Sequence, residues 1–488
     1  MKKYIIVLLV SVTGLTGTSC NDWLDLEPDN KVVVKEGTGI GSLSEANGRL
    51  NALYAMLRAY ELYGARMTYY GDALGEDMMS RSGTMRTANY YTFRFTEDNA
   101  PRTFWDKYYE VINNVNTLLA GIDGLTGLST ADEVTRKDYK GQALTIRALA
   151  YFDLTRLYGY PYQKDNGASL GVPIVDKPVD ANYKPTRNTV AECYTFFIKD
   201  FTDAVPLLKD AKISGKFNKW TAMHLLSRAY LYKGDDTNAL ATAKEAITGA
   251  EGKGYKLWTA EEYGAAATWA KEFDPEVLWE LPITSTETAG GNENIGYLTY
   301  AAGYDDIYVS DDWRITLMGD QTDDIRYKNL IDGGSGKSGV RYLWKHVPNS
   351  GETNRGHSNV KVLRLSELYL IAAEAAARSN NNDDAMKYLE PIVTRGDATQ
   401  TVEGTTVTLD RVLEERRKEL VGEGHRFFDA IRNGKHITRT QGLPFPHLAL
   451  ILPEAWDFDW TYYKVVLPIP ISEINANKNI AGQQNPGY

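Results

Sequence analysis

The chain has 488 residues, with 54 Lys and Arg against 64 Asp and Glu and a formal net charge of −10. Because no block of basic residues occurs anywhere, the composition argues against nucleic acid as a partner. Only two cysteines are present, whereas 32 tyrosines outnumber 13 phenylalanines. A chain of this length can bury a large core without disulfides.

The N-terminal residues 1–19 have the layout of a secretory signal peptide. Two lysines precede the apolar run Tyr4–Val12, and the small, polar stretch Thr13–Ser19 ends directly at Cys20. The apolar run is too short to span a bilayer. A cysteine at this place predicts a lipoprotein that is cut before Cys20 and acylated on its thiol. The usual leucine three residues upstream is Gly17 here, so an ordinary signal peptide beside a cysteine stays the alternative.

If Cys20 is acylated, Cys193 has no partner within the chain, and we expect no disulfide. No later segment reaches the run of about 18 apolar residues that a transmembrane helix needs. The mature chain is therefore predicted to be exported and tethered by lipid alone.

Helical periodicity dominates most of the remaining chain, and it predicts four helix pairs. Apolar residues lie on two faces of the segment 142–158, which is typical of a helix packed between two neighbours. In the segment 223–247, Leu226, Gly234 and Ala239 fall at the spacings of a tetratricopeptide repeat. Four such pairs exceed the three or so that a stacked array needs. The predicted pairs are Ser44–Tyr60 with Thr103–Ile122, Gln142–Tyr158 with Ala191–Leu208, the two halves of Met223–Ile247, and the two halves of Leu365–Val393.

Between Ala250 and Arg364 the periodicity fades, and the stretch Leu281–Trp313 is rich in Gly, Tyr, Thr and Asp. Long irregular segments inside a fold are usually binding loops or disorder. The density of Tyr and Trp argues for binding loops.

Several motifs that suggest catalysis are incomplete. The loop Gly333–Gly339 resembles a phosphate-binding loop, but the place of its first glycine is taken by Ile331. The run Val32–Ser42 lacks the third glycine of a dinucleotide-binding loop, so Ser42 or Ser44 is predicted to cap the next helix instead. The histidines show no close pair with metal-ligand spacing, and we expect neither a metal nor a cofactor. Cys193 lies on an apolar helix and is interpreted as core filler rather than a nucleophile.

The segment Leu413–Lys435 concentrates charge. Its acids and bases could form an active site, or a buried ion-pair network that pins the helix end at Gly422–Gly424 while Phe427 and Phe428 enter the core. Arginine favours such fork-shaped pairings, and the structural interpretation is preferred. Carboxylates are abundant elsewhere, so a glycosidase pair stays open although nothing marks one out.

These stretches together resemble the SusD/RagB family of outer-membrane nutrient-binding lipoproteins. The resemblance runs over nearly the whole chain and is carried by six stretches in order. They are CNDWLDLEP (Cys20–Pro28), FWDKYYEVINNVN (Phe104–Asn116), ALTIRALAYFDLTRLYG (Ala143–Gly159), LRLSELYLIAAEA (Leu363–Ala375), ERRKELVGEGHRFFDAIRNG (Glu415–Gly434) and LPIPISEINANKNIAGQQNPGY (Leu467–Tyr488).

The resemblance implies a mainly α fold, a superhelix of four tetratricopeptide-like helix pairs with an irregular, loop-rich subdomain. It divides the chain into the signal peptide 1–19, an N-terminal region 20–249 and a C-terminal region 250–488. It also implies a non-enzymatic lipoprotein on the outer face of the outer membrane. Such a protein captures an oligosaccharide, or in a minority of members a peptide, for a SusC-like TonB-dependent transporter. A helical-repeat glycoside hydrolase is the remaining alternative.

No ligand residue transfers by motif, so the candidates are chosen by position. Aromatic residues on helix stripes, such as Trp105, Tyr109, Tyr151 and Trp220, are expected in the core. Aromatic residues in loops can stack on a sugar, with polar neighbours as hydrogen-bond partners. The ligand-binding candidates are Asn89, Tyr90, Tyr91, Trp269, Asn292, Asn294, Tyr300, Tyr304, Tyr308, Asp311, Trp313 and Arg314.

Overall fold

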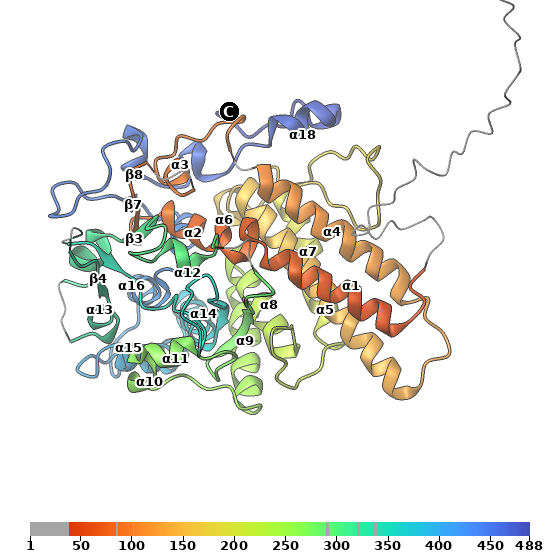
Figure 1. Cartoon of the computed structure of the whole chain (residues 1–488), viewed down its shortest axis with the longest axis horizontal. Helices are drawn as coiled ribbons and strands as arrows, with labels where there is room; N and C mark the ends of the chain where they lie inside the picture. The colour runs from red at the N-terminus through yellow and green to blue at the C-terminus, as the bar shows by residue number, and fades with distance from the viewer. Residues whose placement is uncertain are drawn as a thin grey trace, which may run out of the picture. The chain divides into compact units, whose positions relative to one another are not determined.

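The computed structural model describes residues 39–83, 86–100, 102–288, 292–319, 323–335, 337 and 339–488. The signal peptide and Cys20 lie outside the described residues. Residues Ile40–Tyr488 form one unit, and helices make up most of its regular structure (Figure 1).

Four helix pairs follow one another along the chain. They are α1 (Leu43–Arg58) with α4 (Arg102–Ile122), α5 (Thr130–Tyr158) with α7 (Val190–Ala204), α8 (Lys219–Lys233) with α9 (Asp236–Glu251), and α14 (Leu365–Arg378) with α15 (Asn382–Gly396). Successive pairs are in contact, because α4 packs on α5, α7 on α8 and α9 on α14. Figure 1 shows α1, α4, α5 and α7 gathered on one side and α14 and α15 on the other. This arrangement confirms the predicted stack of four tetratricopeptide-like pairs.

The α8–α9 pair shows why small residues occupy the repeat positions. Gly234 ends α8 in the left-handed conformation, with φ +82°, which a residue without a Cβ adopts freely. Ala239 and Ala243 of α9 are fully buried between the two helices and their neighbours. A Cβ on Gly249 would lie 2.1 Å from the ring of Trp220, so a glycine is required at that contact. The close approach of the helices therefore depends on these small side chains.

Local capping signals set where the helices begin. The Glu45 amide donates to the Ser42 hydroxyl over 3.2 Å at the start of α1, which confirms the predicted cap. Thr189 and Glu192 form a reciprocal capping box at the start of α7. Of the four aromatic residues expected in the core, Trp105, Tyr151 and Trp220 are buried, whereas Tyr109 is half-buried and packs against the ring of Trp105, with centroids 5.0 Å apart.

Shorter elements fill the connections between the pairs and the C-terminal part. They are η2 (Tyr60–Gly64), α2 (Arg66–Ala73), β1 (Met78–Ser80), α3 (Ala88–Tyr91), α6 (Tyr162–Asp165), α10 (Ala260–Gly264), α11 (Ala266–Ala270), β2 (Val277–Leu281), α12 (Ile295–Leu298), β3 (Ile307–Val309), η3 (Asp312–Leu317), α13 (Ile325–Lys328), β4 (Ile331–Asp332), β5 (Arg341–Tyr342), β6 (Val360–Arg364), α16 (Leu409–Leu420), α17 (Arg426–Arg432), β7 (Ile437–Thr438), η4 (Pro453–Ala455), β8 (Asp457–Phe458), η5 (Tyr463–Val465), α18 (Ile471–Ala476) and η6 (Lys478–Ile480). The predicted irregular, loop-rich subdomain is thus made of short helices and small sheets.

A four-stranded antiparallel sheet in the order β1-β3-β5-β4 joins distant parts of the chain. Met78 pairs with Val309 and Ser80 pairs with Ile307. This register brings the segment after α2 beside the segment after α12, more than 200 residues later. The Gly- and Tyr-rich loop that precedes β3 is positioned by this pairing.

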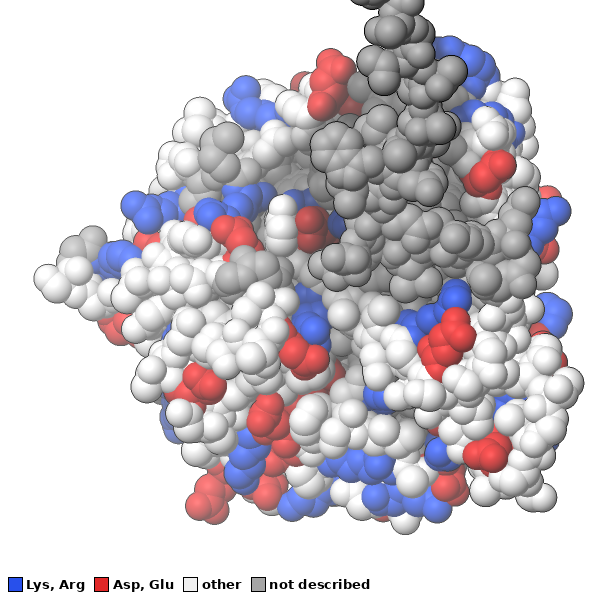
Figure 2. Space-filling model, turned by 45° about the vertical axis from the view of Figure 1, so that its right-hand side comes forward, with Lys and Arg blue, Asp and Glu red and all other residues white. Residues whose placement is uncertain are grey.

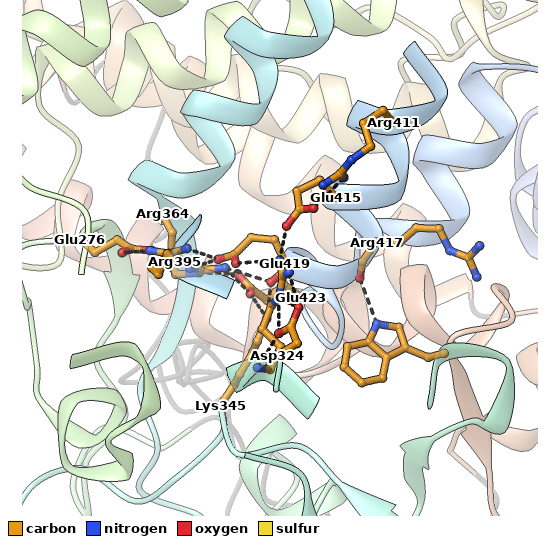
Figure 3. A network of polar contacts seen from close by, with 12 residues as sticks. Glu276, Asp324, Lys345, Arg364, Arg395, Arg411, Glu415, Arg417, Glu419 and Glu423 are labelled. Carbon is orange, nitrogen blue, oxygen red and sulfur yellow. Dashed lines mark hydrogen bonds and ion pairs between the residues drawn. The ribbon is translucent and has the colours of Figure 1, made fainter. Parts of the chain in front are cut away.

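A buried network of ion pairs links the subdomain to the last helix pair (Figure 3). The guanidinium of Arg364 lies 2.6 Å from Glu276, 2.8 Å from Glu419 and 2.7 Å from Glu423. Arg395 of α15 pairs with Glu276 at 2.6 Å and with Glu419 at 2.7 Å. Burial opposes ionisation of Glu419, but the charges of Arg395 and Arg364 outweigh it, so the pKa of Glu419 lies below its usual range.

A second branch of the network joins α16, α17 and α14. Arg416 pairs with Asp429 at 2.9 Å, and Arg432 pairs with Glu374 at 2.6 Å. Phe427 is 1% exposed, so it enters the core as predicted. The charged segment therefore forms the predicted structural network, in which the buried carboxylates Glu415, Glu419, Glu423 and Asp429 each pair with an arginine.

Candidate functional site

The candidate site is built around residues 292–306, which we call the tyrosine loop; it contains α12 and ends at β3. The loop is closed by its own backbone, because the amide of Tyr304 donates to the carbonyl of Tyr297 over 3.1 Å. A Cβ on Gly303 would lie 2.4 Å from the same carbonyl oxygen, so only glycine fits there. Asp305 takes the left-handed conformation, φ +57°, which aspartate tolerates better than most residues. The loop is thus a fixed structure rather than an open strand of chain.

Hydrogen bonds from side chains tie the start of the loop to its surroundings. The carboxamide of Asn294 caps α12 by accepting from the amide of Tyr297 over 3.0 Å, and its Nδ2 donates to the carbonyl of Gly356 over 2.6 Å. The carboxylate of Asp305 pairs with Lys337 at 2.8 Å and with Arg81 at 3.2 Å. Both ends of the loop are therefore anchored.

The anchored loop presents three half-buried tyrosines. Tyr297 and Tyr304 pack edge to face, with ring centroids 5.0 Å apart. The ring of Tyr300 lies 4.3 Å from the guanidinium of Arg355. A partly exposed aromatic ring offers an apolar face, while its hydroxyl offers a hydrogen bond at the edge. This combination suits a ligand that has both polar groups and a flat apolar face.

Charged groups adjoin the rings. The guanidinium of Arg86 lies 3.9 Å from the centroid of the Tyr304 ring and donates two hydrogen bonds, of 2.6 and 2.8 Å, to Glu293. It also lies 3.4 Å from Asp306. The hydrogen bond from Arg86 lowers the pKa of Glu293, so this carboxylate is ionised at neutral pH. Acceptors and donors thus stand beside an aromatic face.

The first turn of α2 borders the same surface, because α2 packs on α12. The half-buried guanidinium of Arg66 lies 5.5 Å from the centroid of the Tyr60 ring, and its Nε donates to the hydroxyl of Tyr69 over 3.2 Å. The charge of Arg66 also contributes to the lowered pKa of Glu293, after the larger effect of Arg86. The tyrosine loop, Arg86 and this turn of α2 make up the candidate site.

The structure gathers only part of the predicted ligand set at this site. Asn292, Tyr300 and Tyr304 belong to the tyrosine loop and are half-buried. Asn89 of α3 is also half-buried, three residues after Arg86, and its amide lies 3.5 Å from the carbonyl of Asn99. These four residues remain candidates for ligand contact.

Four predicted stacking residues are corrected, because their rings lie in the core. Trp313 is 0% exposed and donates from Nε1 to the carbonyl of Arg417 over 3.2 Å. Trp269 is 2% exposed and packs against the ring of Trp258, with centroids 4.8 Å apart. Tyr90 and Tyr91 are 5% and 0% exposed. A ring enclosed in this way has no face left for a ligand.

The remaining candidates are also committed to the fold. Tyr308 of β3 is buried between neighbouring rings, including that of Phe445 at 6.0 Å. The buried carboxylate of Asp311 accepts from the Phe445 amide over 2.8 Å and from Arg314 over 2.8 Å. Asn294 is fully buried as the cap of α12. Tyr308, Asp311 and Asn294 therefore support the loops instead of facing a ligand, whereas Arg314 is half-buried and paired with Asp311 at 2.8 Å.

Sequence reasoning missed Arg66, Arg86 and Glu293. Glu293 lies between two predicted ligand residues, Asn292 and Asn294, but an acidic residue in a loop carries no signal of its own. Arg86 and Glu293 are 207 residues apart, and no local pattern links them. Only the pairing of β1 with β3 reveals that they meet.

An open groove of about 460 Å³ lies away from the tyrosine loop, beside η3, α16 and α17. Its described lining holds charged, polar and aliphatic side chains and no Tyr, Trp or Phe, namely Thr316, Leu317, Asp410, Leu413, Glu414, Arg417, Arg426, Lys435 and His436. Without a Tyr, Trp or Phe ring this groove lacks the stacking surface predicted for the ligand.

Among the residues that the structure describes, no group of three or more His, Cys, Asp and Glu is arranged to hold a metal ion, and no helix is both long and apolar enough to cross a membrane. Cys193 is buried, and burial raises the pKa of its thiol, which fits core packing rather than nucleophilic attack. On the face drawn in Figure 2, basic and acidic residues are interspersed.

Comparison with known proteins adds independent information. The family model described as the SusD family matches residues 319–488, and the model described as "Starch-binding associating with outer membrane" matches residues 22–231. A protein of known structure from Bacteroides vulgatus is 44% identical, with a TM-score of 0.87, and the match covers 92% of this chain and 100% of that one.

Two further solved structures carry informative descriptions. A SusD superfamily protein from Bacteroides thetaiotaomicron is 34% identical, with a TM-score of 0.85, over 91% of this chain and 100% of that one. A SusD-like carbohydrate binding protein from Bacteroides vulgatus is 25% identical, with a TM-score of 0.78, over 90% of this chain and 97% of that one.

Proposed function

Because this chain belongs to the SusD family, we propose that it is a cell-surface lipoprotein that captures an oligosaccharide and delivers it to a SusC-like TonB-dependent transporter of the outer membrane. The descriptions of the relatives support the class of ligand, since one is a carbohydrate-binding protein and one matching family is described as starch-binding at the outer membrane. The protein acts by binding and release, without a chemical step.

The observation that carries the proposal is the tyrosine loop. Tyr297, Tyr300 and Tyr304 are half-buried on an anchored loop, and Arg86 and Glu293 stand beside them as hydrogen-bonding groups. The C–H face of a sugar ring packs on an aromatic ring, while its hydroxyls need convergent polar groups. Burying one strongly hydrated sugar gains little net free energy, so we expect affinity on the order of micromolar to millimolar. Such affinity suits a protein that must release its cargo.

The ligand class is tested by isothermal titration of the purified protein against panels of oligosaccharides and of peptides. Heat of binding with at least one oligosaccharide and none with the peptides is the expected result. Binding of peptides alone would replace the sugar by the peptide alternative. The same oligosaccharides, incubated with the protein, should release no new reducing ends. Sustained release that a single Asp or Glu substitution abolishes would establish a glycoside hydrolase instead.

The lipid anchor rests on Cys20 and on the acids that follow it. Asp22, Asp25 and Glu27 resemble the short acidic signal that directs such lipoproteins to the outer face of the cell. Two acyl chains on the thiol and one on the amine hold a protein at a membrane without a spanning helix. Labelling of cells with a palmitate analogue should mark the wild type and not Cys20→Ala. Equal labelling of both proteins contradicts acylation at this residue.

The transporter is the partner that a surface lipoprotein needs to pass its cargo inward. A lid that opens and closes must keep one edge attached, so we expect an interface above roughly 2,000 Å² in total. Extraction of the tagged lipoprotein in mild detergent should recover a large β-barrel protein with it. Recovery of the lipoprotein alone under several detergents contradicts the partnership.

A further inference from the structure

Acidic and basic side chains at the tyrosine loop balance one another, with two exceptions. Three cations face three carboxylates there: Arg81 and Lys337 pair with Asp305, and Arg86 pairs with Glu293 and Asp306. Arg66 and Arg355 are the exceptions. Among the residues that the structure describes, no carboxylate forms an ion pair with either guanidinium, although the whole chain carries a net charge of −10. The charged side chains named here therefore leave an excess of positive charge at the site.

The contacts of Arg66 leave its charge without a counter-ion. Its Nε donates to the hydroxyl of Tyr69, its Nη1 donates to the hydroxyl of Thr103, and its guanidinium lies 5.5 Å and 5.7 Å from the ring centroids of Tyr60 and Phe104. Neutral hydroxyls and ring faces hold the guanidinium in place but do not neutralise it. It is positioned without being paired.

Arg355 is held in a similar way on the other flank of the loop. Its Nη1 donates to the carbonyl of His346 over 2.9 Å, and its guanidinium lies 4.3 Å from the centroid of the Tyr300 ring. Its backbone lies against α12, because a Cβ on Gly296 would lie 2.7 Å from the Arg355 carbonyl oxygen. Thus α2, whose first residue is Arg66, packs on the same short helix as the loop before β6 that carries Arg355, and the charge of Arg66 acts on Glu293 of the tyrosine loop.

Arginines with a purely structural role look different in this protein. Arg439 is 2% exposed and donates to the backbone carbonyls of Gly75, Tyr91 and Ala73 over 3.2, 2.8 and 3.0 Å. Arg187 is likewise surrounded by carbonyls. In those sites each of the three guanidinium nitrogens donates to a peptide oxygen. Arg66 and Arg355 are only half-buried and keep donors available for a ligand.

We propose that the oligosaccharide bound at the tyrosine loop is acidic, and that Arg66 and Arg355 bind its carboxylate or sulfate groups while the tyrosines pack on its rings. This inference rests on the proposed function and narrows its ligand to uronic-acid or sulfated sugars. A guanidinium matches a carboxylate or a sulfate with two parallel hydrogen bonds, which are among the stronger hydrogen bonds in proteins. A neutral sugar leaves both charges unpaired.

The test compares sugars that differ in charge and in little else. Oligogalacturonides are titrated beside their fully methyl-esterified forms, and chondroitin sulfate oligosaccharides beside the desulfated ones, at low and high salt. We expect at least one acidic member to bind at least about tenfold more tightly than its neutral counterpart, a difference that salt reduces. If the neutral members bind as tightly as the acidic ones, or if only neutral sugars bind, the inference is overturned and the proposed function stays intact. No binding of any sugar overturns both.

Variants assign the preference to the two arginines. The measured quantity is the ratio of the affinity for the acidic member to that for the neutral one. Arg66→Gln and Arg355→Gln should each lower this ratio about tenfold, whereas Arg66→Lys should retain part of the preference. Arg49→Gln, which removes a surface arginine of α1 paired with Glu45 at 2.7 Å, is the matched control. The melting temperature of each variant is measured first. A preference that survives in a folded Arg66→Gln, Arg355→Gln double variant contradicts the assignment.

Discussion

The guanidinium of Arg86 lies 3.9 Å from the centroid of the Tyr304 ring, and the chain between them runs through more than 200 residues. Arg86 also holds Glu293 with two hydrogen bonds, so one side chain orders both an aromatic face and a carboxylate of the candidate site. The polar groups and the ring are thereby presented together, which is what recognition of a sugar needs.

Truncation of Tyr304 should therefore weaken binding of the ligand without unfolding the protein. We expect Tyr304→Ala to raise the dissociation constant about tenfold or more, equivalent to about 1.4 kcal/mol. The melting temperature should stay near that of the wild type, because the ring is only half-buried. Titration calorimetry gives the affinity and a thermal melt gives the stability. Tyr183→Ala, at a tyrosine that is 43% exposed and lies outside the site, is the control and should change neither.

Substitution of Trp313 should have the opposite profile. Its indole is 0% exposed and bonded to the carbonyl of Arg417, so Trp313→Ala opens a cavity and leaves that carbonyl without its donor. Loss of a buried tryptophan ring costs about 3–5 kcal/mol of the free energy of unfolding. Urea denaturation measures this loss. A folded Trp313→Ala with wild-type stability and weakened ligand binding would restore this residue to the site.

Gly71 of α2 should tolerate no side chain. A Cβ there would lie 2.1 Å from the carbonyl oxygen of Gly424, whose own φ of +80° leaves this backbone little room to shift. We expect Gly71→Ala to destabilise the protein by about 3 kcal/mol, because backbone rather than a flexible side chain must move. Gly48→Ala is the matched control, since Gly48 lies in α1 with nothing within 4 Å of its Cβ position. That substitution should raise the free energy of unfolding by up to about 1 kcal/mol, through helix propensity.

Buried histidines should make stability depend on pH in the acidic range. Burial lowers the pKa of His346 to about 4, against about 6.5 for an unperturbed histidine. Since its folded-state pKa is depressed, the stability that it contributes is complete above about pH 6.5 and is lost as the pH falls toward 4. The limiting slope is about 1.4 kcal/mol per pH unit for one proton.

The effect is isolated by the difference between the wild type and His346→Gln, which retains a donor for the Gly422 carbonyl, 2.8 Å from Nε2 in the wild type. Urea denaturation at several pH values should show the free energy of unfolding of the wild type falling relative to the variant between pH 6.5 and 4. The exposed His436 is the control, because a hydrogen bond to Asp457 raises its pKa and gives a dependence of opposite sign. A constant difference across this range contradicts the neutral state of His346.

The sequence alone predicts the four helix pairs, because each is encoded by short-range signals. Apolar periodicity, small residues at positions such as Ala239 and Ala243, and caps such as Ser42 act within a few residues and are visible in the order of the chain. The same holds for the charged segment 413–435, where the spacing of acids and arginines indicates a structural network. The family, too, follows from six stretches that are recognisable together, in their order along the chain.

Only the tertiary structure decides which aromatic residues face solvent. Trp313 and Tyr304 stand nine residues apart in equally irregular sequence, yet one is buried beneath α16 and the other is half-buried beside Arg86. The two residues differ in burial because they meet different distant segments, which lie 104 residues away in one case and more than 200 residues away in the other. Burial of a loop residue depends on contacts that are distant in sequence, and no local pattern records them.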